Sequence, residues 1–234
     1  MKKETRMHAN PRAPGGAICR RLVLPVLAAL AGPVLAQTPG PSTAAHYYGG
    51  VHGGVNLIDK WPAEVNFGGA TAGGSLKLER SLHFGLFAGQ ERDKVRLELE
   101  YQRGRVEVES ASLGPVTQAV SGKGRYQALT ANAYRTFELA PRWNGYLGVG
   151  IGWGSVDLPQ LAAVSGCNCF RDASENGLVV QARVGAEYQI DAEQFVSAQL
   201  TALRLPGPDS GTTPGVRYSS RWLGALSLGY RRRF

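Results

Sequence analysis

The sequence has 234 residues, among them 26 Lys and Arg and 18 Asp and Glu, for a formal net charge of +8. Removing residues 1–36 leaves 20 basic and 17 acidic residues, a net charge of +3, so most of the excess belongs to the N-terminal segment. The remaining basic residues alternate with carboxylates, which argues against a nucleic-acid-binding protein. The 31 glycines exceed the usual share of about 7% and indicate a chain poor in helix.

The N-terminal segment has the form of an export signal. Basic residues precede an apolar stretch at 22–31, which is followed by small residues up to Ala36. That stretch is about ten residues long, whereas a spanning helix needs about 20, so we expect a cleaved signal and not an anchor. We expect cleavage between Ala36 and Gln37, after export by general secretion rather than by the twin-arginine route that Arg20-Arg21 also fits.

A Pro-rich segment at 37–45 has no periodicity and is expected to be a flexible leader. The folded domain is then expected over residues 46–234, where hydrophobic and polar residues alternate almost everywhere. The strand at 95–103 shows this most clearly, because its two faces differ in chemistry. One face has Val95, Leu97, Leu99 and Tyr101, and the other has Arg96, Glu98, Glu100 and Gln102.

The same period of two predicts eight strands. They are expected at residues 46–57, 80–89, 94–106, 125–138, 145–156, 177–189, 195–205 and 218–234. Short polar turns at 90–93, 139–144 and 190–194 alternate with long irregular loops at 58–79, 107–124, 157–176 and 206–217. Such alternation is typical of a bacterial membrane barrel, with the turns and both termini periplasmic and the four long loops extracellular.

These elements predict an all-β fold, an eight-stranded antiparallel up-and-down transmembrane β-barrel. A soluble barrel of the lipocalin type is the alternative, because the alternation alone does not tell which face is inside. The export signal favours the membrane barrel. The terminal Phe234 also favours it, as do aromatic residues near strand ends, which are typical of membrane interfaces: Tyr47, Tyr48, Phe137, Trp143, Tyr188, Trp222 and Tyr230.

Several short segments carry a family likeness, at residues 47–50, 97–101, 132–134, 146–152, 185–188 and 228–234. Through them, the chain from 47 to 234 resembles the small outer-membrane β-barrels that include opacity-type surface proteins and the transmembrane domain of OmpA. The resemblance implies a location in the bacterial outer membrane. It also implies an assembly signal at Ser227, Gly229 and Phe234 that the barrel assembly machinery recognises, although Arg232 stands where that signal has a hydrophobic residue.

Charged residues on the predicted inner face are expected to form a charge network in the lumen: Arg96, Glu98, Glu100, Arg183 and Glu187. An eight-stranded barrel is only just wide enough for its own side chains, so we expect a plugged, salt-bridged interior rather than an open pore. The glycines at 148, 150, 152 and 154 are expected to leave room for long side chains opposite. Their spacing is not the G-x-G-x-x-G of a dinucleotide-binding loop.

The remaining candidate residues predict no catalytic, cofactor or metal site. His46 and His52 are six residues apart on one strand, about 20 Å, which is too far for one metal ion. His83 is alone, with no Ser in the sequence context of a lipid-modifying barrel hydrolase. Cys167 and Cys169, in the third long loop, fit either a disulfide or two thiols that are free or paired between molecules.

The sequence therefore predicts a monomeric integral outer-membrane protein that is not an enzyme and has a structural or surface-interaction role. Its barrel would present four long extracellular loops to the environment, a host surface or lipopolysaccharide. Expected partners are outer-membrane lipid, lipopolysaccharide, the assembly machinery and a surface ligand. The alternatives are a narrow porin-like channel for small solutes and a lipid-modifying barrel enzyme. On the periplasmic side, Arg92, Lys94, Arg142 and residues 231–233 are expected near the headgroups.

Overall fold

The computed structural model describes residues 45–162, 164 and 166–234. The predicted export signal, its cleavage site and residues 37–44 of the leader lie outside the described residues. The chain divides into Met1–Ser42 and Thr43–Phe234, and the second unit contains the fold. In the described part of this unit, no helix is long and apolar enough to cross a membrane.

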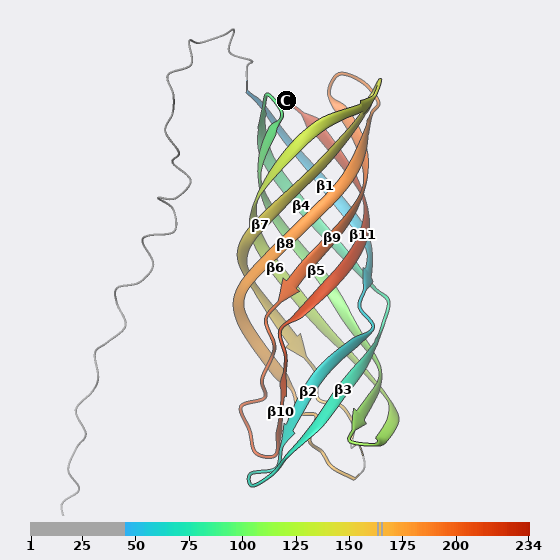
Figure 1. Cartoon of the computed structure of the whole chain (residues 1–234), viewed down its shortest axis with the longest axis vertical. Helices are drawn as coiled ribbons and strands as arrows, with labels where there is room; N and C mark the ends of the chain where they lie inside the picture. The colour runs from blue at the N-terminus through green and yellow to red at the C-terminus, as the bar shows by residue number, and fades with distance from the viewer. Residues whose placement is uncertain (1–44, 163, 165) are drawn as a thin grey trace, which may run out of the picture. The chain divides into compact units, whose positions relative to one another are not determined.

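The described residues form eleven strands. They are β1 (His46–Leu57), β2 (Lys60–Asn66), β3 (Thr71–Glu79), β4 (Ser81–Arg92), β5 (Val95–Leu113), β6 (Val116–Ala140), β7 (Trp143–Leu158), β8 (Ala173–Gln189), β9 (Gln194–Leu205), β10 (Gly215–Tyr218) and β11 (Arg221–Arg233). Eight of them pair antiparallel in the cyclic order β1–β4–β5–β6–β7–β8–β9–β11, and β11 returns to β1. The ring is closed, which leaves no unpaired edge in its wall (Figure 1). The predicted eight-stranded antiparallel barrel is confirmed.

The prediction of irregular loops is wrong for two of the four long connections. Residues 58–79 contain the β2–β3 hairpin, and residues 107–124 are continuations of β5 and β6 up to a tight turn. In β2, Trp61, Ala63 and Val65 are buried while the residues between them are exposed, so the period of two persists. The wall therefore continues as an ordered extension, since β6 alone has 25 residues against about 9–11 for a transmembrane strand.

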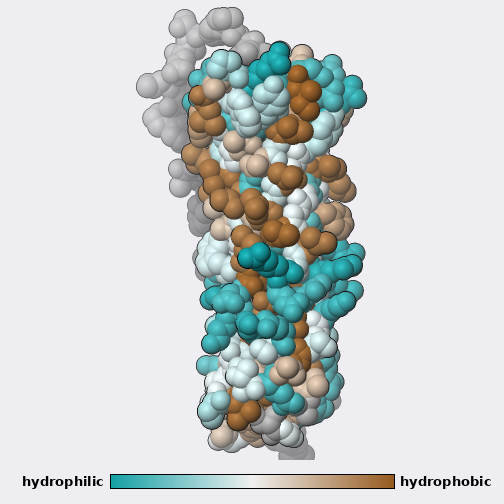
Figure 2. All heavy atoms as spheres, turned by 90° about the vertical axis from the view of Figure 1, so that its right-hand side faces the viewer, coloured by the Kyte–Doolittle hydropathy of each residue, from teal (hydrophilic) through white to brown (hydrophobic). Residues whose placement is uncertain are grey.

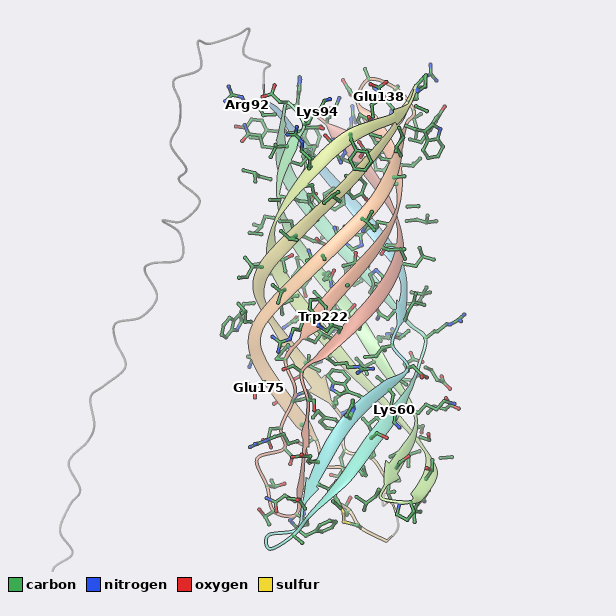
Figure 3. The ribbon with its side chains drawn as sticks, in the orientation of Figure 1. Lys60, Arg92, Lys94, Glu138, Glu175 and Trp222 are labelled. Atoms are coloured by element: carbon green, nitrogen blue, oxygen red, sulfur yellow. A yellow bond between two sulfur atoms is a disulfide. The ribbon has the colours of Figure 1, made fainter. Side chains whose placement is uncertain are left out.

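The outer face of the barrel carries an apolar belt. Leu99, Val149 and Leu228 point outward and are 57%, 66% and 70% exposed, and Figure 2 shows such residues as a brown zone in the upper half of the view. The belt lies between the turns at one end of the barrel, marked by Arg92 in Figure 3, and the exposed Trp222. Apolar surface as continuous as this is typical of contact with lipid rather than with water.

The two faces of the wall exchange polarity along β5. In the first half of the strand, Leu99 points outward and Glu100 is buried inside the barrel. In the second half, Arg105 points outward and Val106 is buried. The alternation continues without a break from Val95 to Val108, so only the chemistry of each face changes over this stretch. The first half is suited to lipid outside, and the second half is suited to water outside.

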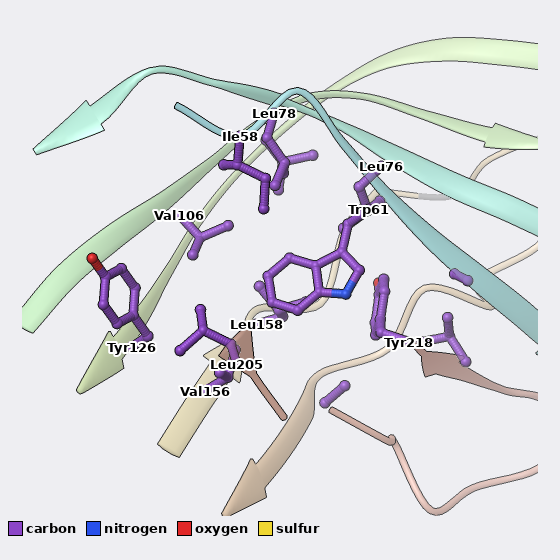
Figure 4. Close-up of a cluster of buried hydrophobic side chains, with 14 of the residues drawn as sticks. Ile58, Trp61, Leu76, Leu78, Val106, Tyr126, Val156, Leu158, Leu205 and Tyr218 are labelled. Carbon is purple, nitrogen blue, oxygen red and sulfur yellow. The ribbon is translucent and has the colours of Figure 1, made fainter. Parts of the chain in front are cut away.

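A hydrophobic core fills the extension (Figure 4). Trp61 is fully buried there, packs edge-on against Tyr218, and donates its indole N–H to the Ser219 carbonyl oxygen at 2.7 Å. Leu76 of β3 and Leu158 of β7 belong to the same core. Because burial of apolar surface is the main stabilising term, at about 25 cal/mol per Å², the extension is a packed unit and not four independent loops.

Candidate functional site

The structure places all five charged residues of the predicted lumen network inside the membrane-spanning half. Arg96, Glu98, Glu100, Arg183 and Glu187 are each at most 9% exposed. Their strands bring them inward because each occupies the position opposite a belt residue in the alternation of β5 or β8. They divide into two neighbouring groups, one around Glu100 and one around Glu187.

Glu100 is the centre of the first group. Its carboxylate accepts a hydrogen bond from Arg183 Nη2 at 2.7 Å and lies 2.6 Å from His52 Nε2. The amides of Asn132 and Gln181 donate to its other oxygen at 3.0 and 3.1 Å. A carboxylate with so many donors is satisfied without water, as a buried charge must be.

The second group joins two carboxylates to three guanidinium groups. Arg96 forms a bidentate pair with Glu187 and also donates to Glu91 at 3.2 Å. Arg231 donates to Glu187 at 3.0 Å and to Glu91 at 3.2 Å, and Arg233 reaches Glu91 at 2.8 Å. Such interlocked charges hold each other in place across β4, β5, β8 and β11.

Sequence reasoning missed Glu91 and misplaced Arg231 in this group. Arg231 was expected near the periplasmic headgroups, but it is 4% exposed and lies with its guanidinium 4.0 Å from the centre of the Phe195 ring. The reason is the alternation of β11, which points Tyr230 and Arg232 outward and Arg231 inward. The period of two along β11 was therefore the sequence signal that could have placed Arg231 in the lumen. Arg92 and Lys94 are exposed at the turn end, as Figure 3 shows.

The lumen of the membrane-spanning half is filled by these side chains and by tyrosines. Tyr48 and Tyr134 both donate to Glu98 at 3.2 Å, and the Arg183 guanidinium lies against the Tyr134 ring. The space left between Arg96, Arg183 and their neighbours is about 30 Å³, the volume of one water molecule. These side chains therefore leave little space in this part of the lumen.

His83 is not alone, contrary to the sequence-based expectation. Its Nε2 lies 2.8 Å from the Ser227 hydroxyl, and its ring is 5.8 Å from that of His52. Serine and histidine at this distance suggest a hydrolase, but an acid must also orient the histidine. The Nδ1 atom of His83 has no partner in the described residues, and Glu100 contacts His52 instead. The pair is buried in the lumen and lacks the third member of a triad.

Two of the four glycines, Gly148 and Gly150, make room for side chains of β6, as predicted, whereas a Cβ at Gly152 would meet the backbone of β6. A Cβ at Gly148 would lie 2.3 Å from the Tyr134 ring, and one at Gly150 would overlap the Asn132 amide. Both neighbours belong to the lumen network. Glycine at these positions therefore allows the network to fit within an eight-stranded wall.

Cys167 and Cys169 lie in the connection between β7 and β8 with their Cα atoms 5.2 Å apart, a separation that fits the predicted disulfide. Cys169 is fully buried in the core of the extension. Across the described residues, no three His, Cys, Asp or Glu side chains come together in a way that could hold a metal ion.

Of the predicted assembly residues, Ser227 and Gly229 lie on β11 and Phe234 directly follows it. Ser227 faces the lumen, Gly229 pairs with His52 of β1, and Phe234 is 79% exposed with its amide donating to the Tyr47 carbonyl oxygen at 2.9 Å. An accessible aromatic ring at the strand end is compatible with recognition by another protein.

Comparisons with known proteins give a fold and no family. No family model matches the sequence, and no curated protein matches it. Neisserial surface protein A matches the structure with a TM-score of 0.50 and 15% identity, covering 82% of this chain and 100% of that one. The outer membrane protein OprG from Pseudomonas aeruginosa matches with a TM-score of 0.54 and 13% identity, covering 81% and 96%.

The chain has the fold of the small outer-membrane β-barrels. The apolar belt on this closed barrel makes it an integral membrane protein, and the fold is that of the bacterial outer membrane. The predicted fold class and location are therefore confirmed, whereas the opacity-type family remains a prediction.

Proposed function

We propose that this protein is a non-conducting, non-enzymatic outer-membrane barrel with a structural and surface-interaction role. One observation carries the proposal: the interior is filled along both halves of the wall. Side chains around Glu100 and Glu187 fill the membrane-spanning half, and the apolar core around Trp61 fills the extension. A scaffold filled in this way is rigid, and rigid scaffolds present their outermost segments for binding.

A narrow channel for small solutes is the main alternative, and the extension argues against it. A solute that passed the charge network would still meet Trp61, Val65 and Leu205, each at most 1% exposed. Moving an ion through such a core would require the core to open. We therefore expect the barrel to be closed both in its membrane-spanning half and in the extension.

A lipid-modifying enzyme is the weaker alternative. Its chemistry needs a nucleophile and a base at the lipid-facing rim. The described contact of this kind, His83 with Ser227, lies in the lumen with both residues at most 5% exposed. Lipid has no access to that hydroxyl.

The proposal includes a defined orientation. The extension with β2, β3 and β10 is outside the cell, and the short turns such as the one at Asp93 are periplasmic. The proposed partners are outer-membrane lipid and lipopolysaccharide at the belt, a surface ligand at the extension, and the barrel assembly machinery at Phe234. The protein acts as a monomer.

Two measurements test the proposal. In planar lipid bilayers we expect no stable single-channel conductance from the refolded chain, and steady open-channel currents would contradict a closed barrel. An epitope inserted at the exposed turn of Gly114 should be detected by antibody on intact cells. The matched insertion at Asp93 should be detected only after the outer membrane is permeabilised, and the reverse result would overturn the orientation.

A further inference from the structure

The outer wall is hollowed where the apolar belt ends on β5 and β6. The groove has a volume of about 890 Å³ and is reached from outside the barrel. Six side chains of its lining point outward and are exposed: Leu82, Phe84, Arg103, Arg105, Lys123 and Arg125. Figure 2 shows that strongly hydrophilic residues gather directly below the belt on the face in view.

Most of the basic groups in the groove have no partner. Within the described part of the chain, Arg103, Arg105 and Lys123 make no side-chain hydrogen bond or ion pair. Arg125 is paired, because its Nε lies 2.9 Å from Asp157. Asp157 is the single carboxylate among the described lining residues, so the groove has a clear excess of positive charge.

The strand register concentrates that charge. Arg105 of β5 lies directly opposite Arg125 of β6. Like charges that face each other across an antiparallel pair are destabilising, and an anion between them would reverse the effect. Lys123 faces Glu107, which offsets it, whereas Arg103 faces the neutral Gln127. The uncompensated charge is therefore centred on Arg103 and Arg105.

The same strand faces are apolar on the membrane side of these groups. Tyr101 precedes Arg103 on the outer face of β5, and Leu129 lies opposite Tyr101 on β6. On β4, Leu82 and Phe84 are 65% and 51% exposed, and Phe84 lies directly opposite Arg103, so these apolar side chains lie beside the basic groups. Successive outward-pointing residues of a strand are about 7 Å apart. The guanidinium groups therefore lie beyond the end of the belt by about the thickness of a lipid headgroup.

We propose that this groove binds the phosphate groups of a phosphorylated glycolipid in the outer leaflet, with the acyl chains against Leu82 and Phe84. Arginine is suited to this task because its planar guanidinium binds phosphate through two parallel hydrogen bonds. A free phosphate ion would satisfy Arg103 and Arg105 but would make no use of the apolar side chains. The inference rests on the proposed function, because it requires the extension to be outside the cell.

The test is a titration of the refolded chain, in zwitterionic micelles, with bisphosphorylated lipid A, and binding is read by native mass spectrometry. The triple variant Arg103→Gln, Arg105→Gln, Lys123→Gln should raise the Kd at least about tenfold, since it removes charge-assisted hydrogen bonds. The control variant Arg92→Gln, Lys94→Gln, Arg135→Gln removes the same charge from exposed positions at the turn end and should leave the Kd within about threefold.

Two further measurements distinguish a phosphate carried by a lipid from a free phosphate ion. Dephosphorylated lipid A should bind the unaltered chain about as weakly as bisphosphorylated lipid A binds the triple variant. Millimolar inorganic phosphate should not displace the lipid. Displacement by inorganic phosphate, or an equal loss of affinity in both triple variants, would overturn the proposal.

Failure of the site can be told from failure of the proposed function. Heat-dependent gel mobility reports whether each variant forms the closed barrel. If the chain forms the closed barrel but binds lipid A equally well with and without its phosphates, the groove alone is refuted. If the chain never shows the heat-dependent gel shift, the membrane barrel itself is refuted.

Discussion

Arg183 of β8 donates to Glu100 of β5 at 2.7 Å across the lumen, and both side chains are almost fully buried. The pair connects opposite sides of the ring, because β6 and β7 separate the two strands in the pairing order. The contact therefore fixes the width of the barrel and the position of the hydrogen-bonding groups around it. It also makes the two residues dependent on each other.

Replacing Arg183 by methionine should destabilise the barrel by about 3–5 kcal/mol, because Glu100 is then a buried carboxylate without its main partner. The double variant Arg183→Met, Glu100→Gln should regain most of that loss. Urea unfolding in lipid vesicles, followed by tryptophan fluorescence, measures both. Arg204→Met on the exposed face of β9 is the control and should change stability by at most about 0.5 kcal/mol. Equal stability of the single variant and the unaltered chain would refute the dependence.

Replacing Trp61 by alanine should open the extension without unfolding the barrel. The side chain is fully buried, and truncating a buried tryptophan costs about 3–5 kcal/mol. The loss falls on β2, β3 and β10, which are not strands of the closed ring, although β3 pairs with the second half of β5. We expect fast proteolysis within residues 60–79 and an unchanged heat-dependent gel shift. Phe67→Ala, at the exposed tip of the same hairpin, should remain resistant. Loss of the gel shift in Trp61→Ala would show that the two halves are one cooperative unit.

A valine at position 148 should impair folding through overpacking. Its Cβ would lie 2.3 Å from the Tyr134 ring and 2.4 Å from the Ala133 carbonyl oxygen. Inserting atoms into a packed interior costs about 1–3 kcal/mol, so a smaller fraction of the chain should refold into vesicles. Gly73→Val is the matched control, because nothing lies within 4 Å of a Cβ there. Equal refolding yields for the two variants would mean that the lumen is looser than the contacts indicate.

The sequence was sufficient for the barrel because the period of two is local. Each of the eight wall strands could be located from alternation alone, and the five lumen charges followed from their positions within it. The β2–β3 hairpin was missed although residues 60–66 alternate between apolar and polar. A membrane strand is expected to have its apolar residues on the outer face, whereas those of β2 are on the buried face, so the segment was assigned to a loop. Recognising it required knowing that the two faces exchange polarity beyond the membrane.

Contacts between distant strands could not be read from the sequence. Arg231 and Glu91 are 140 residues apart, and His83 and Ser227 are 144 residues apart. Their meeting depends on how β4, β1 and β11 are staggered, and a change of one residue in that register would turn every side chain to the other face. The groove of Arg103 and Arg105 needs the register of β5 with β6 for the same reason.

The segment around Asp209 should lose order as the pH falls. Asp209 accepts a hydrogen bond from the Gly211 amide at 2.8 Å and one from Arg217 Nε at 2.7 Å, and these contacts, the backbone one first, lower the pKa of its carboxyl. A carboxyl whose pKa is lower in the folded state adds stability above its ordinary pKa of about 3.9, and that stability disappears as the pH drops through the lowered value. The chemical shift of the Gly211 amide should therefore titrate with a midpoint below about 3.9. Arg217→Gln should move that midpoint upward, whereas Arg135→Gln, far from the carboxylate in sequence and exposed on β6, should not. A midpoint at the ordinary value in the unaltered chain would show that the hydrogen bonds to Asp209 do not persist in solution.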